Sequence, residues 1–284
     1  MTDQTYVLTL TCPDRAGIVH AVTGLLVEQH GNIVESQQFG DLAEDRFFMR
    51  VKFAVEGDVT VASLRAAFTP VAERWGMAWE LWAATAPYRT LILVSKFSHC
   101  LNDLLFRWSS GSLQIDVAGV VSNHPDCETL VRSYGVPYHH VPVTPETKAD
   151  AEAKMLSLVD TLDVDLVVLA RYMQVLTDET CRALSGKAIN IHHSFLPSFK
   201  GARPYHQAFD RGVKLVGATA HYVTGDLDEG PIIEQDVMRV DHGYDAAALA
   251  AAGRDVESQV LSRAVRWHAE SRVLLNGHKT VVFR

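Results

Sequence analysis

Hydrophobic positions in the first third of the chain follow two different periods. Between residues 18 and 26 they recur every three to four positions, which predicts a helix with one apolar face. Between residues 46 and 53 they alternate with other positions, which predicts a half-buried antiparallel strand. Further strands are predicted at 6–10, 32–39 and 77–82, and a second helix at 60–75. The order strand, helix, strand, strand, helix, strand is ferredoxin-like.

After a short linker at 85–89 the pattern changes to apolar strands that alternate with helices. Strands are predicted at 90–95, 115–122, 138–143, 165–170 and 188–192, and helices at 101–108, 147–162 and from residues 127 and 177. Apolar strands separated by helices indicate a mostly parallel, Rossmann-like sheet, whose ligands bind outside the carboxyl ends of the strands. We therefore predict an α/β chain of two domains, residues 1–85 and residues 86–284.

Composition narrows the class of protein. The chain has 284 residues, which suits two domains, and 48% of them are hydrophobic. It has no uninterrupted apolar run of about 20 residues and no secretory signal at its start. Its four cysteines are scattered without a C-x-x-C pair, so a cytoplasmic location with reduced thiols is expected. The net charge of -8 disfavours a broad nucleic-acid surface.

Two polar side chains lie near the end of the predicted strand 188–192. Asn190 and His192 are two positions apart, so they point to the same face of the strand, whereas His193 is expected to point away. An Asn amide and a protonated His can both donate to the oxyanion that forms when a carbonyl is attacked. By spacing alone this pair is only suggestive, since polar strand ends are often structural.

A second segment, 217–235, supplies further candidate groups. It contains His221 in a predicted strand, followed by a polar loop with the acids Asp226, Asp228 and Glu229. A carboxylate beside an imidazole raises the pKa of that imidazole and can relay a proton. The spacing leaves open which acid meets His192, and a structural role for His221 is the alternative. A metal site is not expected, because no H-E-x-x-H spacing is present.

The segment TCPDRAGIVHAVTGLLVEQHGNIV resembles the ACT regulatory domain. This resemblance implies that the first domain pairs with another copy, so that the chain forms a homo-oligomer. It also implies a small amino acid, glycine or methionine, as an effector near the turn that opens the first helix. The residues placed there by the resemblance are Asp14, Gly17 and Asn32. A plain packing module without a ligand is the alternative.

The segments INIHHSFLP, GARPYHQAFDRGVKLVGATAHYVT and LDEGPIIEQ resemble the family of formyltetrahydrofolate formyltransferases and hydrolases, over residues 90 to 284. The family pattern is Asn-x-His-x-Ser-x-Leu-Pro, a Thr-x-His strand and a Leu-Asp-x-Gly-Pro loop, which implies the catalytic set Asn190, His192 and Asp228. The resemblance also implies that DLVVLARYMQVL and the loop after His221 hold the folate. The implied substrate contacts are Met173, Gln174, Leu176, Val223, Thr224 and Asp226, with core packing as the alternative for Met173 and Leu176.

Within this family the chain resembles the deformylase branch. The first strand of the second domain runs into SKFSHCLNDLL, which lacks the Gly-rich turn that holds a substrate phosphate in the glycinamide ribonucleotide enzymes. His193 stands where other branches have proline. The implied reaction is hydrolysis of 10-formyltetrahydrofolate to tetrahydrofolate and formate, in one-carbon metabolism linked to purine synthesis. The alternative is transfer of the formyl group to an amine.

The resemblance also sets the remaining expectations. The folate is the substrate, so no cofactor is expected, and neither a nucleic acid nor a membrane is expected as a partner. His221 is expected to orient Asp228 or His192 from behind. His99, after the first strand of the second domain, is the candidate for excluding an amine acceptor or holding water. Lys200 and Arg203 are expected at the pocket mouth, where they would meet the carboxylates of the folate tail. An amino-acid sensor with an inactive enzyme domain is disfavoured because the Asn-His-Asp set is intact.

Overall fold

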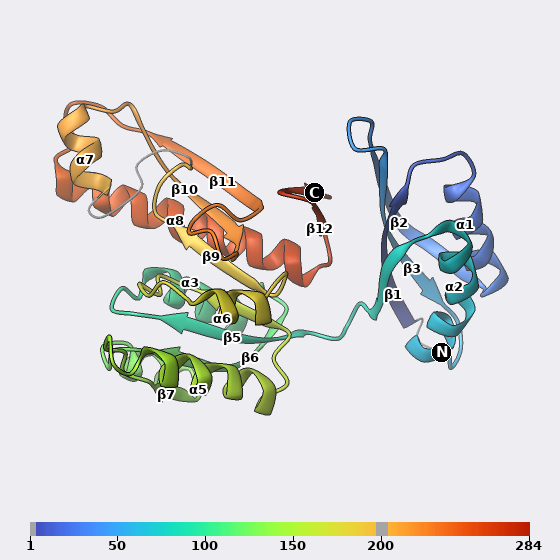
Figure 1. Ribbon diagram of the computed structural model, residues 1–284, viewed down its shortest axis with the longest axis horizontal. Coiled ribbons are helices and arrows are strands. Elements are labelled where there is room, and N and C mark those ends of the chain that lie inside the picture. Colours follow the sequence, from blue (N-terminus) through green and yellow to red (C-terminus); the bar gives the residue numbers. More distant parts are fainter. Residues whose placement is uncertain (1–3, 197–203) are drawn as a thin grey trace. The chain divides into compact units, whose positions relative to one another are not determined.

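The protein is described by a computed structural model that covers residues 4–196 and 204–284 (Figure 1). It divides into two compact units. The first comprises residues up to Pro87 together with Glu270–Asn276 and Val281–Arg284, and the second comprises Tyr88–Ala269 and Gly277–Thr280. Within the described ranges, no helix combines the length and the apolar character needed to cross a membrane.

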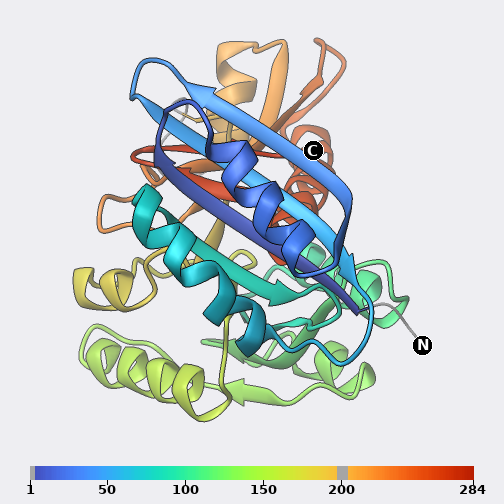
Figure 2. The ribbon, with the colours of Figure 1, turned by 90° about the vertical axis from the view of Figure 1, so that its right-hand side faces the viewer.

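The first unit is built on a four-stranded antiparallel sheet in the order β2-β3-β1-β4. The elements are β1 (Gln4–Pro13), α1 (Ile18–Glu28), β2 (Gly31–Asp41), β3 (Arg46–Val55), α2 (Val61–Trp75) and β4 (Ala78–Ala83). Both helices lie on the same face of the sheet (Figure 2). Buried apolar residues of α1, such as Ile18 and Val22, share one core with Met49 and Phe53 of β3. The predicted ferredoxin-like order is confirmed.

The opposite face of this sheet is covered by the C-terminal arm of the chain, residues 270–276 and 281–284. Phe48, whose neighbours in β3 face the helices, packs there with Leu274 and Phe283. This arm carries the strands β12 (Val273–Asn276) and β13 (Lys279–Val282). The predicted boundary placed all of residues 86–284 in the second domain. The structure differs because Phe48 leaves an apolar patch on the second face of the sheet, which the arm buries.

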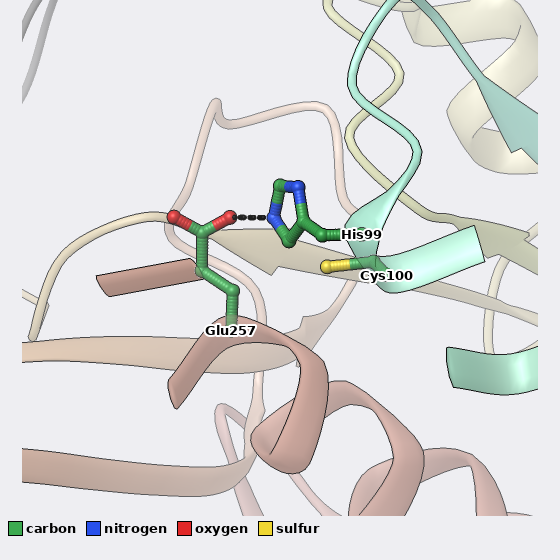
Figure 3. Close-up of side chains that lie close together, drawn as sticks. All are labelled: His99, Cys100 and Glu257. Atoms are coloured by element: carbon green, nitrogen blue, oxygen red, sulfur yellow. Dashed lines mark hydrogen bonds and ion pairs between the residues drawn. The ribbon is translucent and has the colours of Figure 1, made fainter. Parts of the chain in front are cut away.

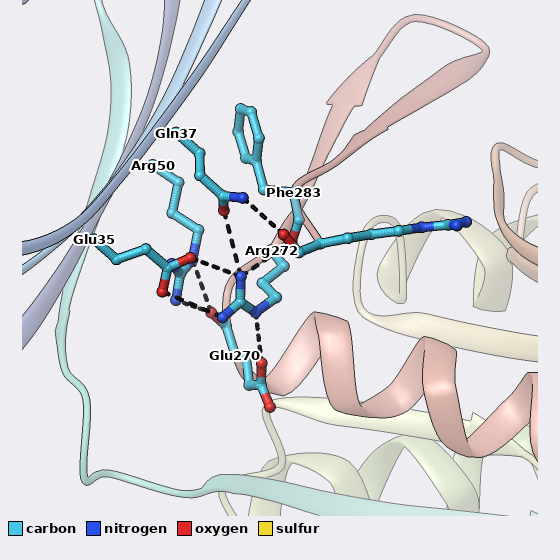
Figure 4. Close-up of polar contacts among 7 residues, drawn as sticks. Glu35, Gln37, Arg50, Glu270, Arg272 and Phe283 are labelled. Carbon is cyan, nitrogen blue, oxygen red and sulfur yellow. Dashed lines mark hydrogen bonds and ion pairs between the residues drawn. The ribbon is translucent and has the colours of Figure 1, made fainter.

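Charged groups fix the arm to the sheet (Figure 4). Nη1 of Arg272 lies 2.9 Å from Oε1 of Glu35, and Nε of Arg272 lies 2.5 Å from Oε2 of Glu270. The buried Arg50 lies 3.2 Å from the same Glu35 oxygen, and its Nη2 donates to the carbonyl of Glu270 at 2.9 Å. Glu35 therefore forms ion pairs with two arginines, Arg272 of the arm and the buried Arg50 of β3.

The second unit is built on a seven-stranded sheet in the order β11-β10-β9-β8-β5-β6-β7. Strands β5 to β9 are parallel, whereas β10 runs antiparallel to both β9 and β11. The strands are β5 (Tyr88–Val94), β6 (Ile115–Ser122), β7 (Tyr138–His140), β8 (Leu166–Leu169), β9 (Ala188–His192), β10 (Leu215–Tyr222) and β11 (Ile232–Arg239). The predicted mostly parallel, Rossmann-like sheet is confirmed.

Helices cover this sheet, and one of them is much longer than the rest. They are α3 (His99–Ser109), α4 (Glu128–Ser133), α5 (Lys148–Thr161), α6 (Asp178–Ala183), α7 (Pro204–Arg211) and α8 (Ala246–Ala269). Helix α8 packs on β10, β11 and α3. It carries one buried acid, Glu257, among its buried apolar residues. The carboxyl ends of β8 and β9 lie side by side, because these two strands are paired and parallel.

Candidate active site

Pairing of β9 with β10 brings the first two polar groups together. Asn190 lies opposite His221 in this antiparallel pair. Nδ2 of Asn190 lies 3.3 Å from Nε2 of His221, and Nδ1 of His221 lies 2.9 Å from the carbonyl oxygen of Tyr222. Since that carbonyl can only accept, Nδ1 of His221 donates to it. When the imidazole is neutral, Nε2 accepts one of the two amide protons of Asn190, and when the imidazole is charged, Nε2 donates towards Asp228 instead.

Asp228 joins the two imidazoles. Its Oδ2 lies 3.1 Å from Nδ1 of His192, and its Oδ1 lies 3.6 Å from Nε2 of His221. His192, His221 and Asp228 are all largely buried. The structure thus brings together Asn190, His192 and Asp228, the set that the motifs predict, and it adds His221 in direct contact with two of its members.

The loop that carries Asp228 has a demanding backbone. Asp228 has a φ of 58°, in the left-handed region that few side chains other than those of Gly, Asn and Asp adopt. A Cβ on Gly230 would lie 1.7 Å from the carbonyl oxygen of Tyr222, so only glycine fits there. The amide of Tyr222 donates to the carbonyl of Pro231 at 2.9 Å. Close approach of the loop to β10 therefore fixes the position of the Asp228 carboxylate.

Charge in this cluster is concentrated on Asp228. Burial alone would raise the pKa of Asp228, but hydrogen bonds and charge interactions with His192 and His221 outweigh burial and hold it well below its ordinary value. The carboxylate is therefore ionised at neutral pH. Nε2 of His192 is buried and has no hydrogen-bond partner among the described residues. Because Nδ1 of His192 faces Asp228, this second nitrogen is the one available to a ligand.

These groups line a cavity of about 240 Å³. Every described residue that the resemblance assigns to folate binding also lines it, namely Met173, Gln174, Leu176, Val223, Thr224 and Asp226. Met173 is half exposed and Leu176 is buried. Lys200 and Arg203, expected at the pocket mouth, lie outside the residues that the structure describes.

Buried polar side chains hold the cavity wall after β8 in place. The amide of Met173 donates to Oγ of Ser95 at 2.9 Å, and Ser95 in turn donates to Asn123 at 2.7 Å. The carboxylate of Glu152 accepts from the amide and the hydroxyl of Thr177, at 3.1 Å and 2.6 Å. Residues 173–177 are therefore tied at both ends, which fixes the wall against which a flat ring would pack.

Two basic residues of the cavity lining, His193 and Arg171, were not among the predicted site residues. His193 was expected to point away from Asn190 and His192, and that expectation is wrong, because His193 lines the same cavity. The reason is that β9 ends at His192, so strand alternation no longer applies beyond it. The rings of His192 and His193 stack with centroids 5.0 Å apart. Arg171 also lines the cavity; its signal was a charged residue directly after a buried apolar strand.

His193 is an uncharged group at neutral pH. Burial, followed by the charge interactions with Arg171 and His192, lowers the pKa of His193 to about 4. His193 can therefore accept a hydrogen bond beside His192, but it does not contribute a positive charge to the cavity.

A second buried cluster lies beside Arg171, a residue of the cavity lining. Glu257 of α8 lies 2.7 Å from Nε2 of His99 (Figure 3) and accepts from the hydroxyl of Tyr205 at 2.6 Å. Burial raises the pKa of Glu257, but His99, Arg171 and Tyr205 outweigh burial and lower it. A Cβ on Gly253 would lie 2.0 Å from the Tyr205 hydroxyl, so this glycine of α8 makes room for the ring. His99 therefore orients Glu257, and among the described residues no hydrogen bond or ion pair joins it to Asn190, His192 or Asp228.

The donor atoms of His99, Cys100 and Glu257 lie within 4.8 Å of one another, a spacing that a metal ion could span. Burial, however, raises the pKa of the Cys100 thiol, which opposes the thiolate form that binds metals. Both carboxylate oxygens of Glu257 already accept hydrogen bonds. The set is better suited to a hydrogen-bonded core than to a metal centre.

The candidate regulatory residues lie in the first unit. Asp14 and Gly17 belong to the turn between β1 and α1, where Gly17 has a φ of 98°. Asn32, in β2, lines a small separate cavity with His30, Ala54 and Glu56. Neither Asp14 nor Gly17 lines the cavity that Asn32 lines.

Comparison with known proteins shows the class to which this fold and site belong. The formyl transferase family matches residues 88–265, and the ACT domain matches residues 6–68. The first match spans more than half of the chain and contains Asn190, His192 and Asp228. The chain belongs to the formyl transferase family and carries an ACT domain in front of the catalytic unit.

Individual relatives narrow the comparison. A formyltetrahydrofolate deformylase from Corynebacterium sp. (strain P-1) is 56% identical over 280 residues, covering 98% of each chain. The crystal structure of a formyltetrahydrofolate deformylase from Burkholderia mallei ATCC 23344 has a TM-score of 0.95 at 54% identity and covers 99% of this chain and all of that one. A glycinamide ribonucleotide transformylase from Symbiobacterium toebii has a TM-score of 0.65 at 30% identity, covering 70% of this chain and 95% of that one.

Proposed function

We propose that this protein hydrolyses 10-formyltetrahydrofolate to tetrahydrofolate and formate, in one-carbon metabolism linked to purine synthesis. The observation that carries the proposal is the arrangement of Asn190, His192 and Asp228 in one cavity with the walls that the resemblance assigns to the folate. Near-full-length similarity to formyltetrahydrofolate deformylases supports it. The substrate is the folate itself, and the proposal needs no further cofactor.

In the proposed mechanism the formyl oxygen lies between Asn190 and His192. Nε2 of His192 and the second amide proton of Asn190 donate to this oxygen, and these bonds strengthen as water attacks the carbon and negative charge develops. Asp228 orients the His192 ring through the 3.1 Å contact with Nδ1, and its negative charge stabilises positive charge that develops on that ring. Its lowered pKa makes Asp228 a weak base, so holding this charge and orienting the water are its main contributions.

Collapse of the tetrahedral intermediate breaks the bond between the formyl carbon and N10. One proton of the attacking water passes to N10, and the other is released when formic acid ionises. His221 contacts both Asn190 and Asp228, and we assign it the role of positioning these two groups. Proton transfer by positioned side chains typically contributes about 10²–10⁴-fold to a rate.

The test is release of formate from 10-formyltetrahydrofolate by the purified full-length protein. We expect formate to appear with water as the only acceptor, at a rate that added amines leave unchanged. Appearance of a formylated amine in place of formate would establish the alternative, a formyltransferase. A matched His192→Gln variant, which keeps a polar group but cannot be charged, should release formate at least about 10²-fold more slowly.

For the first unit we propose assembly and regulation. The ACT domain supports pairing into a homo-oligomer, with glycine or methionine as the effector near Asp14, Gly17 and Asn32. A cytoplasmic location fits this role and the four free cysteines. Titration calorimetry with each amino acid tests the effector, and a steady-state assay shows whether binding changes formate release. Heat signals absent for both amino acids would leave assembly alone.

A further inference from the structure

Hydrolysis and transfer of a formyl group differ in the charge of the product that carries the formyl carbon. Transfer to an amine converts one uncharged formamide into another. Hydrolysis converts an uncharged formamide into formate, an anion with two acceptor oxygens. Both reactions pass through a tetrahedral oxyanion, but only hydrolysis leaves an anionic product at the position of the formyl carbon, so only a hydrolase must hold and release an anion there.

Arg171 is a buried positive group at the cavity. It follows β8 directly, has a φ of 65° and has a side chain that is only 10% exposed. Its guanidinium carbon lies 5.8 Å from the centre of the Phe97 ring, a cation–π distance. A non-glycine residue with positive φ beside a cavity is a strained feature that the fold must support, and such features concentrate at functional sites.

The hydrogen-bonding capacity of Arg171 is largely unused. Among the described residues, neither Nε nor Nη1 has a hydrogen-bond partner, although both atoms are buried. Nε lies 3.4 Å from Oε2 of Glu257, close enough for charge attraction but without hydrogen-bond alignment. Glu257 is instead hydrogen-bonded to His99 and Tyr205. Buried charged donors without an acceptor are costly, so these two nitrogens favour an acceptor other than those that the described residues supply.

His192 presents a second unused donor to the same cavity. Its Nδ1 faces Asp228, whereas its Nε2 is buried and unpartnered among the described residues. Arg171 and His192 both line the cavity, and His193 is stacked on His192 and is affected by the charge of Arg171. Burial is the main cause of the low pKa of His193, and the interactions with Arg171 and His192 lower it in the same direction.

We propose that the guanidinium of Arg171 and Nε2 of His192 form a subsite for the formate anion at the catalytic end of the cavity. The inference rests on the proposed function and deepens it. Water oxygen bonds to the formyl carbon, the bond to N10 breaks with a proton going to N10, and the remaining acid proton is released. His192 holds the oxygen that was the formyl carbonyl, and Arg171 holds the oxygen that came from water.

The first experiment measures formate binding to the wild-type full chain. Sodium formate is titrated at constant ionic strength against sodium chloride, and both the melting temperature and the inhibition of hydrolysis are followed. We expect a saturable, formate-specific rise in melting temperature and matching product inhibition. A formate response no larger than that of chloride would overturn the proposal.

The second experiment compares variants. Arg171→Gln should weaken formate binding by roughly 10- to 100-fold, the range for a charged hydrogen bond, while the KM for the folate changes far less. Arg171→Lys keeps the positive charge but not the paired donors of the guanidinium, so its formate affinity should lie between those of the wild type and Arg171→Gln. Arg107→Gln is the matched control, because Arg107 lies on α3 and pairs with Asp103 at 2.7 Å. A folded Arg171→Gln protein with wild-type formate affinity would refute the subsite.

If the Arg171 variants fail to fold, a crystal of the wild-type protein soaked in formate tests the subsite directly. Density for formate bridging Arg171 and His192 supports the subsite, and an empty cavity or formate elsewhere rejects it. The outcomes are distinguishable from failure of the proposed function. A protein that hydrolyses the folate but ignores formate loses only the subsite, whereas one that binds formate but does not hydrolyse the folate loses the proposed function.

Discussion

Replacing Asp228 with asparagine removes one negative charge from a cavity that otherwise keeps its shape. The carboxylate lies 3.1 Å from Nδ1 of His192 and 3.6 Å from Nε2 of His221. An asparagine oxygen can still accept from His192, so the ring keeps its orientation. What is lost is the negative charge that stabilises positive charge on the His192 ring, together with the acceptor that orients the attacking water.

The size of the effect follows from these two losses. Removal of a general acid–base group costs roughly 10²–10⁴-fold, and loss of a charged oxyanion donor costs on the order of 10²–10³-fold. The two losses share one network, so they do not multiply. We predict that kcat falls at least about 10³-fold, which corresponds to about 4 kcal/mol in the barrier. Folate affinity should change little, because the substitution leaves the proposed folate contacts Met173 and Leu176 in the cavity lining unchanged.

A single-turnover assay with enzyme in excess separates chemistry from release. Formate is measured after rapid mixing with 10-formyltetrahydrofolate, and folate binding is measured separately by fluorescence quenching. Asp226→Asn and Glu229→Gln are the comparison variants, since each removes one charge from the same loop, and each should cost much less in kcat. An Asp228→Asn protein that stays within about tenfold of the wild-type rate would refute the mechanism.

Three further predictions follow from contacts in the structure. Gly230→Ala should lower kcat by about 10²-fold and destabilise the fold by about 1–3 kcal/mol, because its Cβ would meet a backbone carbonyl at 1.7 Å. The control is Gly225→Ala, whose Cβ would have its nearest atom at 3.4 Å. Equal kcat values for the two variants would contradict this prediction. The folded pKa of Asp228 lies below the unfolded value of about 3.9. Its carboxylate therefore stabilises the fold at pH values above the unfolded pKa, and this contribution is lost as pH falls through the folded pKa. The difference in melting temperature between the wild type and Asp228→Asn should narrow below about pH 4. A constant difference down to pH 3 would argue against the ion pair. Glu35→Ala should cost about 1–3 kcal/mol of unfolding free energy, because it leaves the buried Arg50 without its carboxylate. The control, Glu28→Ala on the exposed end of α1, should cost almost nothing. Equal melting temperatures for the two variants would show that the arm does not depend on the Glu35–Arg50 pair.

Local patterns in the sequence determined the elements and part of the site. Alternation in β3 and the helical period of residues 18–26 depend only on neighbouring residues, so they predicted which side chains face the helices. The same two-residue period placed Asn190 and His192 on one face of β9. The motifs singled out Asp228 among three acids, although spacing alone left them equivalent. The structure places that carboxylate between two imidazoles.

Tertiary structure decided what no local period could reach. The register between β9 and β10 places His221 against Asn190, and packing of α8 brings Glu257 to His99 and Arg171. Strand alternation mispredicted His193, since the rule ends where the hydrogen-bonded ladder ends. The C-terminal arm joins the first unit because Phe48 needs apolar partners on the second face of its sheet. In each case the deciding contact joins residues far apart in the chain, and only the folded backbone sets which of them meet.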